Sequence, residues 1–440
     1  MGAVTLMRTP AETALVQAFE AAKGKLPGDR STRERAFNDF IEVGLPHRRV
    51  EEFKYTDLRA ALREAAPFAE KPSAEEAKAA LASAKALADT EAVRIAIVNG
   101  HVVREGSDLD RLPEGVEVVT LAEAQGSDHA MLKHLAPMPL AIENPVYRLN
   151  TAFMTDGVLI RVAANASVDQ PIHLRFVTTG GSALATATRT LVLVEDAASV
   201  TFLESHEGPE GVASQLNDVI EFAVGDRAKV CHVRLNAEGR EALALSTLTA
   251  RLGKAVSFST LNAVVGGSVS RHQVFLTFAG ERSLAEINGA TMIKGRQHAD
   301  TTLVVDHAAL HCTSRELFKT VIDDEATGVF QGKIIVQPHA QKTDGRMMSA
   351  ALLLSDGGTM NNKPELEIFA DDVQCAHGAT AGQLDEDLLF YLKSRGLPQA
   401  EAESLLVQAF LGEAIETVEC ETGHDALIGV VEEWLRARAG

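Results

Sequence analysis

The chain has 440 residues, of which 46 % are hydrophobic and 23 % are charged, a composition typical of a folded globular protein and unlike that of a disordered chain. Acidic residues outnumber basic ones by 61 to 42, and the formal net charge is −19. Such a surface repels phosphate backbones and anionic lipid, so we expect neither nucleic acid nor a membrane as a partner.

The N-terminal residues and the cysteines indicate the compartment. Residues 1–8 read MGAVTLMR, without the apolar run of a secretory signal, and no segment has the ~18 uninterrupted apolar residues of a membrane-spanning helix. Four cysteines lie far apart without a CxxC pair, which excludes a disulfide framework and a self-contained four-thiolate site: Cys231, Cys312, Cys375 and Cys420. We therefore expect a cytoplasmic protein in a reducing environment.

Residues 1–66 predict an N-terminal helical region. Apolar side chains recur at helical spacing in two stripes, at 14–22 and 36–41. Gly44 and Pro46 predict the end of the second helix, because glycine commonly terminates a helix and proline cannot continue one.

Residues 67–145 predict a small α/β region. The sequence Ser73–Glu76 is a capping box that opens an alanine-rich helix reaching about Ala88. The β-branched runs at 93–98 and 116–119 predict two strands.

Residues 146–380 predict a long β core, because β-branched runs separated by short turns replace every helical period. Polar turn residues at 196, 226, 254, 281 and 306 are separated by 30, 28, 27 and 25 positions. This nearly constant step favours the stacked rungs of a β-solenoid. A β-sandwich, whose hairpins recur at similar spacing, is the alternative that the pattern leaves open.

Residues 381–440 predict a second helical region. Asp385–Asp387 place negative charge at a helix start and Lys393 places positive charge at its end. Two further helices carry apolar faces at 402–410 and 427–435. Helices at both ends would cover the backbone groups that the ends of a solenoid expose.

Patterns of catalytic residues are missing from the chain. It contains no GxSxG elbow, no phosphate-binding GxxxxGK[ST], no HExxH and no GxGxxG between strand and helix. The carboxylate pairs Asp323–Asp324 and Asp371–Asp372 could serve acid/base work, as in β-solenoid enzymes that cleave polysaccharides. Those enzymes are usually secreted and rich in cleft aromatics, whereas Phe, Trp and Tyr total 5 % here. We expect no enzymatic activity and assign no catalytic residue.

The densest chemical constellation is the segment 371–380, which contains Cys375 and His377. Residues two apart on an extended segment point to the same face, and a thiolate and an imidazole suit iron or zinc. They supply two ligands, whereas a stable site needs three or four. A partner could supply the others, neighbouring strands could supply them, or both residues are ordinary strand residues, the usual explanation of an isolated Cys-x-His.

Other histidines do not predict a metal site. His307 and His311 are four apart, a spacing that binds metal on a helix, but their segment predicts strand and turn. Cys231 and His232 are adjacent on a predicted strand, so they point to opposite faces and cannot share one ion.

The segment 364–413 closely resembles the SufB/SufD family of iron–sulfur cluster assembly proteins. Within that family, Cys375-x-His377-Gly-Ala-Thr380 resembles the SufD branch, because the SufB branch tends to carry a glutamate there. One departure is Phe53, where the family often has tryptophan. The matching pieces lie at 364–368, 371–380, 389–392 and 394–397, and further back at 52–56, 149–153, 329–332 and 352–355.

The resemblance implies a mainly β fold, a right-handed parallel β-helix core with N-terminal and C-terminal helical regions. It implies pairing with SufB through the β-helix core, and docking of the ATPase SufC on the C-terminal region 381–440. A transient iron–sulfur cluster is expected at the SufB–SufD interface, and none is expected to stay tightly bound to the isolated chain. The family's interface histidine maps onto His377, with Cys375 beside it, and we predict these two as the cluster and metal ligands.

Two interpretations of the role stay open at this stage. In the first, the chain is a scaffold subunit that contributes ligands to a nascent cluster. In the second, it is a purely structural partner in the same complex and contributes none. We also expect that the isolated chain can form an edge-to-edge homodimer that mimics the SufB contact.

Overall fold

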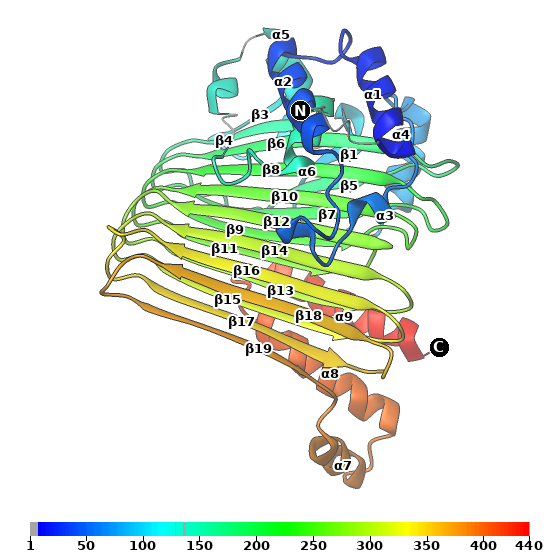
Figure 1. Ribbon diagram of the computed structural model, residues 1–440, viewed down its shortest axis with the longest axis vertical. Coiled ribbons are helices and arrows are strands. Elements are labelled where there is room, and N and C mark those ends of the chain that lie inside the picture. Colours follow the sequence, from blue (N-terminus) through cyan, green and yellow to red (C-terminus); the bar gives the residue numbers. More distant parts are fainter. Residues whose placement is uncertain (1–7, 128, 135–137, 440) are drawn as a thin grey trace, which may run out of the picture.

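The computed structural model describes residues 8–127, 129–134 and 138–439, so residues 1–7 of the N-terminal sequence considered above lie outside it. Two long sheets face each other, and from β4 onward the chain passes from one to the other at each turn (Figure 1). Within each sheet the neighbouring long strands are parallel. This arrangement is a β-solenoid with helices at both ends, which confirms the predicted fold and excludes a sandwich built from antiparallel hairpins.

The odd sheet has the order β19-β17-β15-β13-β11-β9-β7-β5-β1-β2, and the even sheet has the order β18-β16-β14-β12-β10-β8-β6-β4-β3. The odd strands are β1 (Val93–Val98), β2 (His101–Val103), β5 (Ile172–Val177), β7 (Ser199–Glu207), β9 (Lys229–Ala237), β11 (Ser257–Val264), β13 (Leu284–Ile293), β15 (Thr313–Ile322), β17 (Asp344–Leu353) and β19 (Gln374–Gly382). The even strands are β3 (Val116–Thr120), β4 (Val158–Val162), β6 (Ala185–Val194), β8 (Gln215–Val224), β10 (Leu243–Leu252), β12 (Val269–Phe278), β14 (His298–His307), β16 (Thr327–Val336) and β18 (Thr359–Ile368).

The helices lie mainly at the two ends of the chain. The α-helices are α1 (Pro10–Ala22), α2 (Arg30–Val43), α3 (Leu58–Ala61), α4 (Ala74–Ser83), α5 (Leu121–Ser127), α6 (Pro145–Phe153), α7 (Glu386–Ser394), α8 (Gln399–Ile415) and α9 (Glu421–Ala439). Short 3-10 helices are η1 (Glu51–Phe53), η2 (Arg104–Gly106), η3 (Leu109–Arg111) and η4 (Ala130–His134). None of the helices in the described ranges is long and apolar enough to cross a membrane.

The solenoid turns repeat one backbone conformation. Ala197, Arg227, Ala255, Arg282 and His311 all have positive φ values, between 54° and 63°, and a single left-handed residue reverses the chain at each of these corners. The first four follow directly after the predicted turn residues 196, 226, 254 and 281. The fifth predicted turn, at 306, is wrong, because Asp306 lies inside β14 and the chain turns a few residues later.

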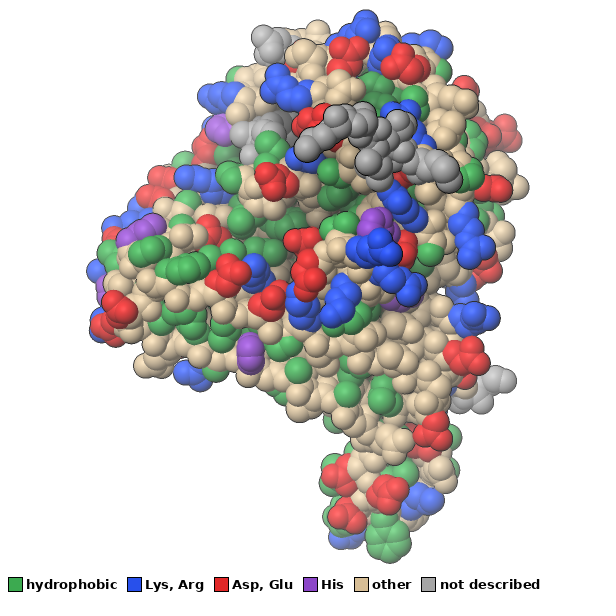
Figure 2. Space-filling view, in the orientation of Figure 1, with side chains coloured by type: hydrophobic (Ala, Val, Ile, Leu, Met, Phe, Trp, Pro, Cys, Tyr) green, Lys and Arg blue, Asp and Glu red, His purple; other side chains and the backbone are tan. Residues whose placement is uncertain are grey.

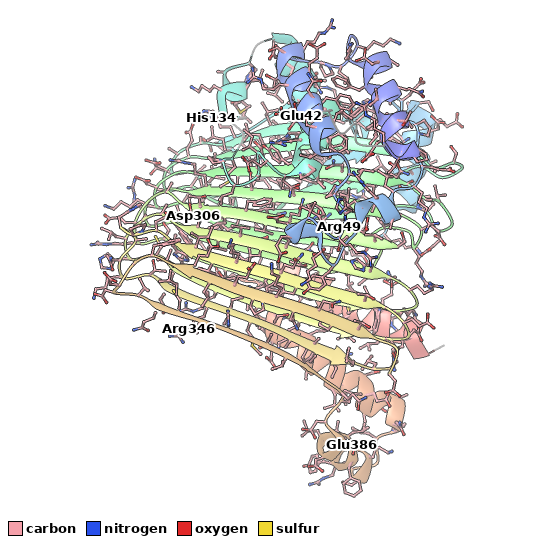
Figure 3. All side chains as sticks on the ribbon, in the orientation of Figure 1. Glu42, Arg49, His134, Asp306, Arg346 and Glu386 are labelled. Carbon is pink, nitrogen blue, oxygen red and sulfur yellow. The ribbon has the colours of Figure 1, made fainter. Side chains whose placement is uncertain are left out.

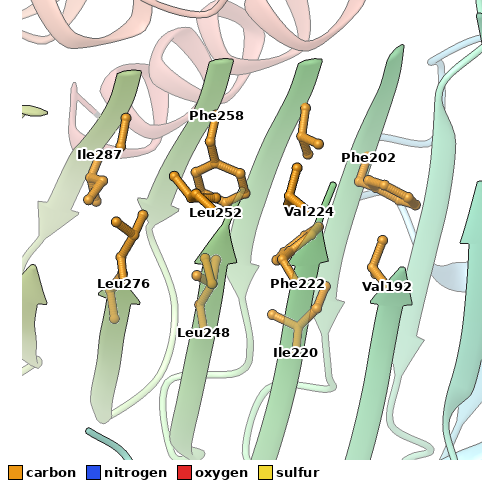
Figure 4. Close-up of a cluster of buried hydrophobic side chains, with 14 of the residues drawn as sticks. Val192, Phe202, Ile220, Phe222, Val224, Leu248, Leu252, Phe258, Leu276 and Ile287 are labelled. Atoms are coloured by element: carbon orange, nitrogen blue, oxygen red, sulfur yellow. The ribbon is translucent and has the colours of Figure 1, made fainter. Parts of the chain in front are cut away.

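The main core fills the space between the two sheets. Inward-facing side chains alternate with outward-facing ones along each strand, and Phe202, Phe222 and Phe258 are at most 2 % exposed there (Figure 4). Phe222 meets the other two rings edge-on, with centroids 5.9 and 5.4 Å away. Burying one such ring contributes about 1.5–3 kcal/mol to stability.

The helical regions cover outer faces of the sheets. Phe19, Phe37 and Phe153, from α1, α2 and α6, pack against the outer face of the even sheet. Helices α8 and α9 cover the outer face of the odd sheet through a second cluster that includes Trp434. Helix α7 projects beyond the last strands (Figure 1).

The segment that contains Glu52 and Phe53 packs on the even sheet against a buried arginine. Arg271 on β12 forms an ion pair with Asp300 on β14, and both side chains are fully buried. The guanidinium lies 4.1 Å from the ring centroid of Phe53 and donates to the carbonyl oxygen of Glu52 at 2.7 Å. The family-like sequence at 52–56 therefore docks on the solenoid wall.

The region 67–145 differs in detail from the expectation. The capping box at Ser73 is present, but α4 ends at Ser83 rather than near Ala88. Strand β1 pairs parallel with β5, and β3 pairs antiparallel with β4. These strands thus extend the two sheets of the solenoid.

Candidate metal-ligand site at the open end of the solenoid

The C-terminal end of the solenoid is an open rung. Strands β18 and β19 are the last in their sheets, and each is bonded to a preceding strand along one edge, β16 and β17 respectively. Most residues of β18 are half-buried and most of β19 are exposed, whereas β17 is largely buried. The outer edges of both strands therefore carry backbone groups available for pairing. Arg346 marks this end of the molecule in Figure 3.

Cys375 and His377 face the space between the sheets. In the ladder, Cys375 stands opposite Gly345 and His377 stands opposite Met347. Met347 is a core residue, 2 % exposed, so the positions in register with it on β19 point inward. Cys375 packs against this core and is half-buried, while His377 is exposed because no further strand stacks on it. The structure thus places both predicted residues side by side at the open rung.

The environment of Cys375 favours the protonated thiol. Burial is the main cause that raises its pKa, and the carboxylates of Asp344 and Glu316 act in the same direction. The backbone N–H of Gly345 opposes them. A thiolate at this position consequently needs a cation, such as a metal ion, to stabilise it.

The rung places one thiol, that of Cys375, and one imidazole, that of His377, on the inward face of β19. In the part of the chain that the structure describes, no three His, Cys, Asp or Glu side chains are arranged to hold a metal ion. The facing strand β18 contributes Met360 and Leu366, which pack against the core, and Asn362, whose Oδ1 accepts a hydrogen bond from Ser349 Oγ at 2.7 Å.

A buried carboxyl lies beneath the open rung, and sequence reasoning missed it. Glu316 on β15 is in register with Met347, which in turn stands opposite His377. It is 2 % exposed, and neither oxygen has a hydrogen-bond partner. Burial raises its pKa to about 8, against weaker opposing influences of Ser314 and Arg315.

The other histidines and cysteine considered above lie in different surroundings. His307 is fully buried, shares a hydrogen bond of 3.0 Å with Ser314 Oγ and stacks on Phe278. His311 lies in the turn that follows, at φ 58°. Cys231 packs outward in the cluster under α8 and α9, while His232 points inward.

A second polar cluster lies deep inside the solenoid. Glu204 accepts hydrogen bonds from His206 at 2.5 Å and Arg234 at 2.9 Å, and its other oxygen lies 3.0 Å from His232 Nε2. Burial lowers the pKa of His206, but the carboxylates of Asp218 and Glu204 outweigh it and raise that pKa. The charges are thus paired within the core, which is how buried ions are usually tolerated.

Helix α7 exposes an apolar surface. Leu388, Phe390 and Tyr391 are 52 %, 74 % and 54 % exposed, and Figure 2 shows hydrophobic side chains at the tip of the projecting lobe. Asp385 caps the helix, because its side chain accepts from the N–H groups of Asp387 and Leu388. A well-formed helix with large uncovered apolar side chains is typical of a protein-binding element.

The fold is a β-solenoid whose last strands have open outer edges and whose helix α7 exposes apolar side chains. Residues 176–410 match the family described as SUF system FeS cluster assembly, SufBD core domain, and residues 22–174 match the SufBD protein N-terminal region. The chain belongs to the SufBD family of iron–sulfur cluster assembly proteins, which confirms the resemblance seen in the sequence.

Relatives cover about two thirds or more of the chain in the three comparisons that follow. A SufBD family iron–sulfur cluster assembly protein of Synechocystis sp. is 32 % identical over 397 residues, covering 88 % of this chain and 86 % of the relative. The iron–sulfur cluster assembly protein SufD of Escherichia coli is 29 % identical, covering 88 % and 89 %. SufD of Bacillus subtilis is 25 % identical, covering 66 % and 67 %.

Proposed function

We propose that this chain is the SufD-type subunit of a SUF assembly complex. It pairs with SufB through the open rung, binds the ATPase SufC through the C-terminal region 381–440, and contributes His377, with Cys375 beside it, to a nascent iron–sulfur cluster. The observation that carries this proposal is the inward-facing Cys-x-His pair on β19, the last strand of its sheet, whose outer edge is unpaired.

An incomplete ligand set suits a scaffold. Iron–sulfur clusters normally take four protein ligands, and the open rung offers two side chains. If SufB supplies the remainder, the site exists only where the two chains meet, and separation of the chains releases the cluster. The cluster is thus cargo rather than a resident cofactor, and its ligation requires an unprotonated imidazole.

The open edge supports pairing through the backbone. Strands β18 and β19 have ten and nine residues, and an added strand from a partner would satisfy their outward N–H and C=O groups. The half-exposed core residues Met360, Leu366 and Val373 would be buried by the same contact. The same edge would serve in a homodimer of the isolated chain.

Helix α7 is the element we assign to SufC. Its exposed aromatic side chains are the kind that dominate protein interfaces, and the helix stands clear of the solenoid (Figure 1). A nucleotide-driven movement of SufC could thereby reach the rung through the short connection between β19 and α7. The function is assembly rather than turnover, and four free thiols fit a reducing cytoplasm.

The test is cluster formation by the complete complex with SufB and SufC. His377→Ala, alone and with Cys375→Ala, should reduce the iron and sulfide bound after anaerobic reconstitution while leaving the complex assembled. His339→Ala, at an exposed turn histidine, is the matched control. Wild-type iron and sulfide in the double variant would instead support the purely structural role.

A further inference from the structure

A long groove runs beside α9, on a part of the molecule distinct from the open rung and from α7. Its volume is about 930 Å³. One wall is the segment 85–91, the other is α9, and the floor comes from the ends of β9 and β11. We call it the α9 groove. The residues of α9 that line it are Glu421, Thr422, Asp425, Ala426, Gly429, Val430, Glu433, Trp434 and Ala437.

The spacing of these residues shows that α9 presents one continuous face to the groove. They recur every three to four positions from 421 to 437, which is one stripe of an α-helix about 24 Å long. Small side chains at Ala426, Gly429 and Ala437 leave space beside this face of α9. A Cβ added at Gly429 would meet no atom within 4 Å. The groove therefore has room for a second helix to lie against α9 at an ordinary packing distance.

The floor of the groove is apolar. Leu235, Ala237 and Val265 line it, with Trp434 on the wall. Leu87 from the opposite wall belongs to the same buried cluster as Trp434. The carboxylate of Glu207 accepts from the backbone N–H groups of Lys85 and Ala86 at 2.7 and 2.8 Å. The opposite wall is thus held in place before any ligand arrives.

The rim of the groove is strongly acidic. Apart from Glu238 in the floor, it has seven acidic residues and two basic ones, Lys85 and Arg240. Arg240 lies 3.9 Å from Glu210 and offsets part of that charge. The acidic residues are Asp89, Glu91, Glu207, Glu210, Glu421, Asp425 and Glu433.

A buried polar group in the floor is unsatisfied. Glu238 is 3 % exposed, and its Oε2 has no hydrogen-bond partner. Burial raises the pKa of this carboxyl to about 8, so it adds no full negative charge to the groove at neutral pH. The groove thus combines an apolar floor with an acidic rim.

We propose that the α9 groove binds a basic amphipathic helix of a partner protein. The apolar face of that helix lies on the partly exposed Ala237, Val265 and Val430, and its Lys or Arg side chains meet the acidic rim. Charge complementarity selects the partner, because an acidic or neutral helix would leave the excess negative charge of the rim, seven carboxylates against two basic side chains, unbalanced. The mode is that of a helix laid in a hydrophobic groove.

Trp434 is the only tryptophan in the chain, so its fluorescence reports on this groove. The probe is an unlabelled 15-residue peptide of Leu and Lys, without Trp, that forms a helix with one apolar face. A scrambled peptide of the same composition is its control. Titration into the full-length protein should give a saturable shift of Trp434 emission, with a Kd in the micromolar range. The scrambled peptide should bind at least tenfold more weakly.

Two pairs of variants separate groove binding from attraction to an acidic protein. Gly429→Phe fills the groove and Gly412→Phe, also in open space on a helix, does not. Asp425→Lys with Glu433→Lys lowers the net charge of the rim from −5 to −1, and Glu20→Lys with Glu42→Lys makes the same change in charge on α1 and α2. The first member of each pair should weaken binding at least tenfold and the second less than twofold. Equal losses within a pair, or equal affinity for both peptides, would overturn the proposal.

Discussion

Replacing the buried acid Glu316 with glutamine should change how stability depends on pH. In the folded chain, burial holds the pKa of this carboxyl at about 8, compared with an ordinary value of 4.5. The folded state therefore keeps the proton over a range in which the unfolded chain releases it. Stability from this group is complete below pH 4.5 and is lost as the pH rises toward 8.

The size of the effect follows from the two pKa values. Each pH unit between them costs the folded state about 1.4 kcal/mol, so the wild type should lose about 3.5 kcal/mol from this group between pH 5 and pH 8. Glutamine has nearly the same shape and no proton to lose. Any cost of burying its amide is a constant offset, so the stability difference between variant and wild type should change by about 3.5 kcal/mol over this range.

Calorimetry can measure this difference. At an unfolding entropy of about 2.1 cal/mol/K per residue, a 440-residue chain shifts its Tm by about 1 °C per kcal/mol, so Glu316→Gln should gain about 4 °C relative to wild type between pH 5 and pH 8. Glu386→Gln, at an exposed residue, should show a constant difference. A constant difference for Glu316→Gln too would mean that this carboxyl is already ionised in the folded protein.

Three further predictions concern the framework. Arg271→Ala should lower the free energy of unfolding, measured in urea, by about 3–5 kcal/mol, because it leaves Asp300 buried without its ion-pair partner. Adding Asp300→Leu should recover part of that loss. Gly157→Ala places a Cβ 2.1 Å from a backbone oxygen at φ 146° and should lower the Tm by at least 2 °C, whereas Gly429→Ala should raise it slightly. Phe390→Ser should keep the wild-type Tm but abolish SufC capture in a pull-down, and unchanged capture would move the docking site away from α7.

The solenoid could be predicted because polar residues mark most of the turns considered. Asp196, Asp226, Lys254 and Glu281 each precede a left-handed corner, and this produces a visible repeat. The failure at Asp306 has a simple cause. The next corner follows Ala308, Ala309 and Leu310, a segment without Gly, Asp or Asn, whereas an aspartate inside a strand imitates a turn signal. Apolar corners are therefore invisible to this kind of reasoning.

The candidate site was predictable only in part. Spacing alone placed Cys375 and His377 on one face of a strand, but it could not say which face meets the interior or that the strand is the last in its sheet. Glu204 and Glu316 were missed for the same reason. Alternation with a period of two separates the faces of a strand, and only the packing of the opposite sheet decides which polar residues are enclosed.

The two ends of the solenoid are unequal. At the N-terminal end the sheets finish in β2 and β3, strands of three and five residues that run antiparallel to their neighbours, whereas the other end finishes in two full-length parallel strands. A molecule with a single long unpaired edge has no such edge left once it has paired with one partner. Growth by stacking would stop at two solenoids, which protects this β-rich chain from polymerising into fibres.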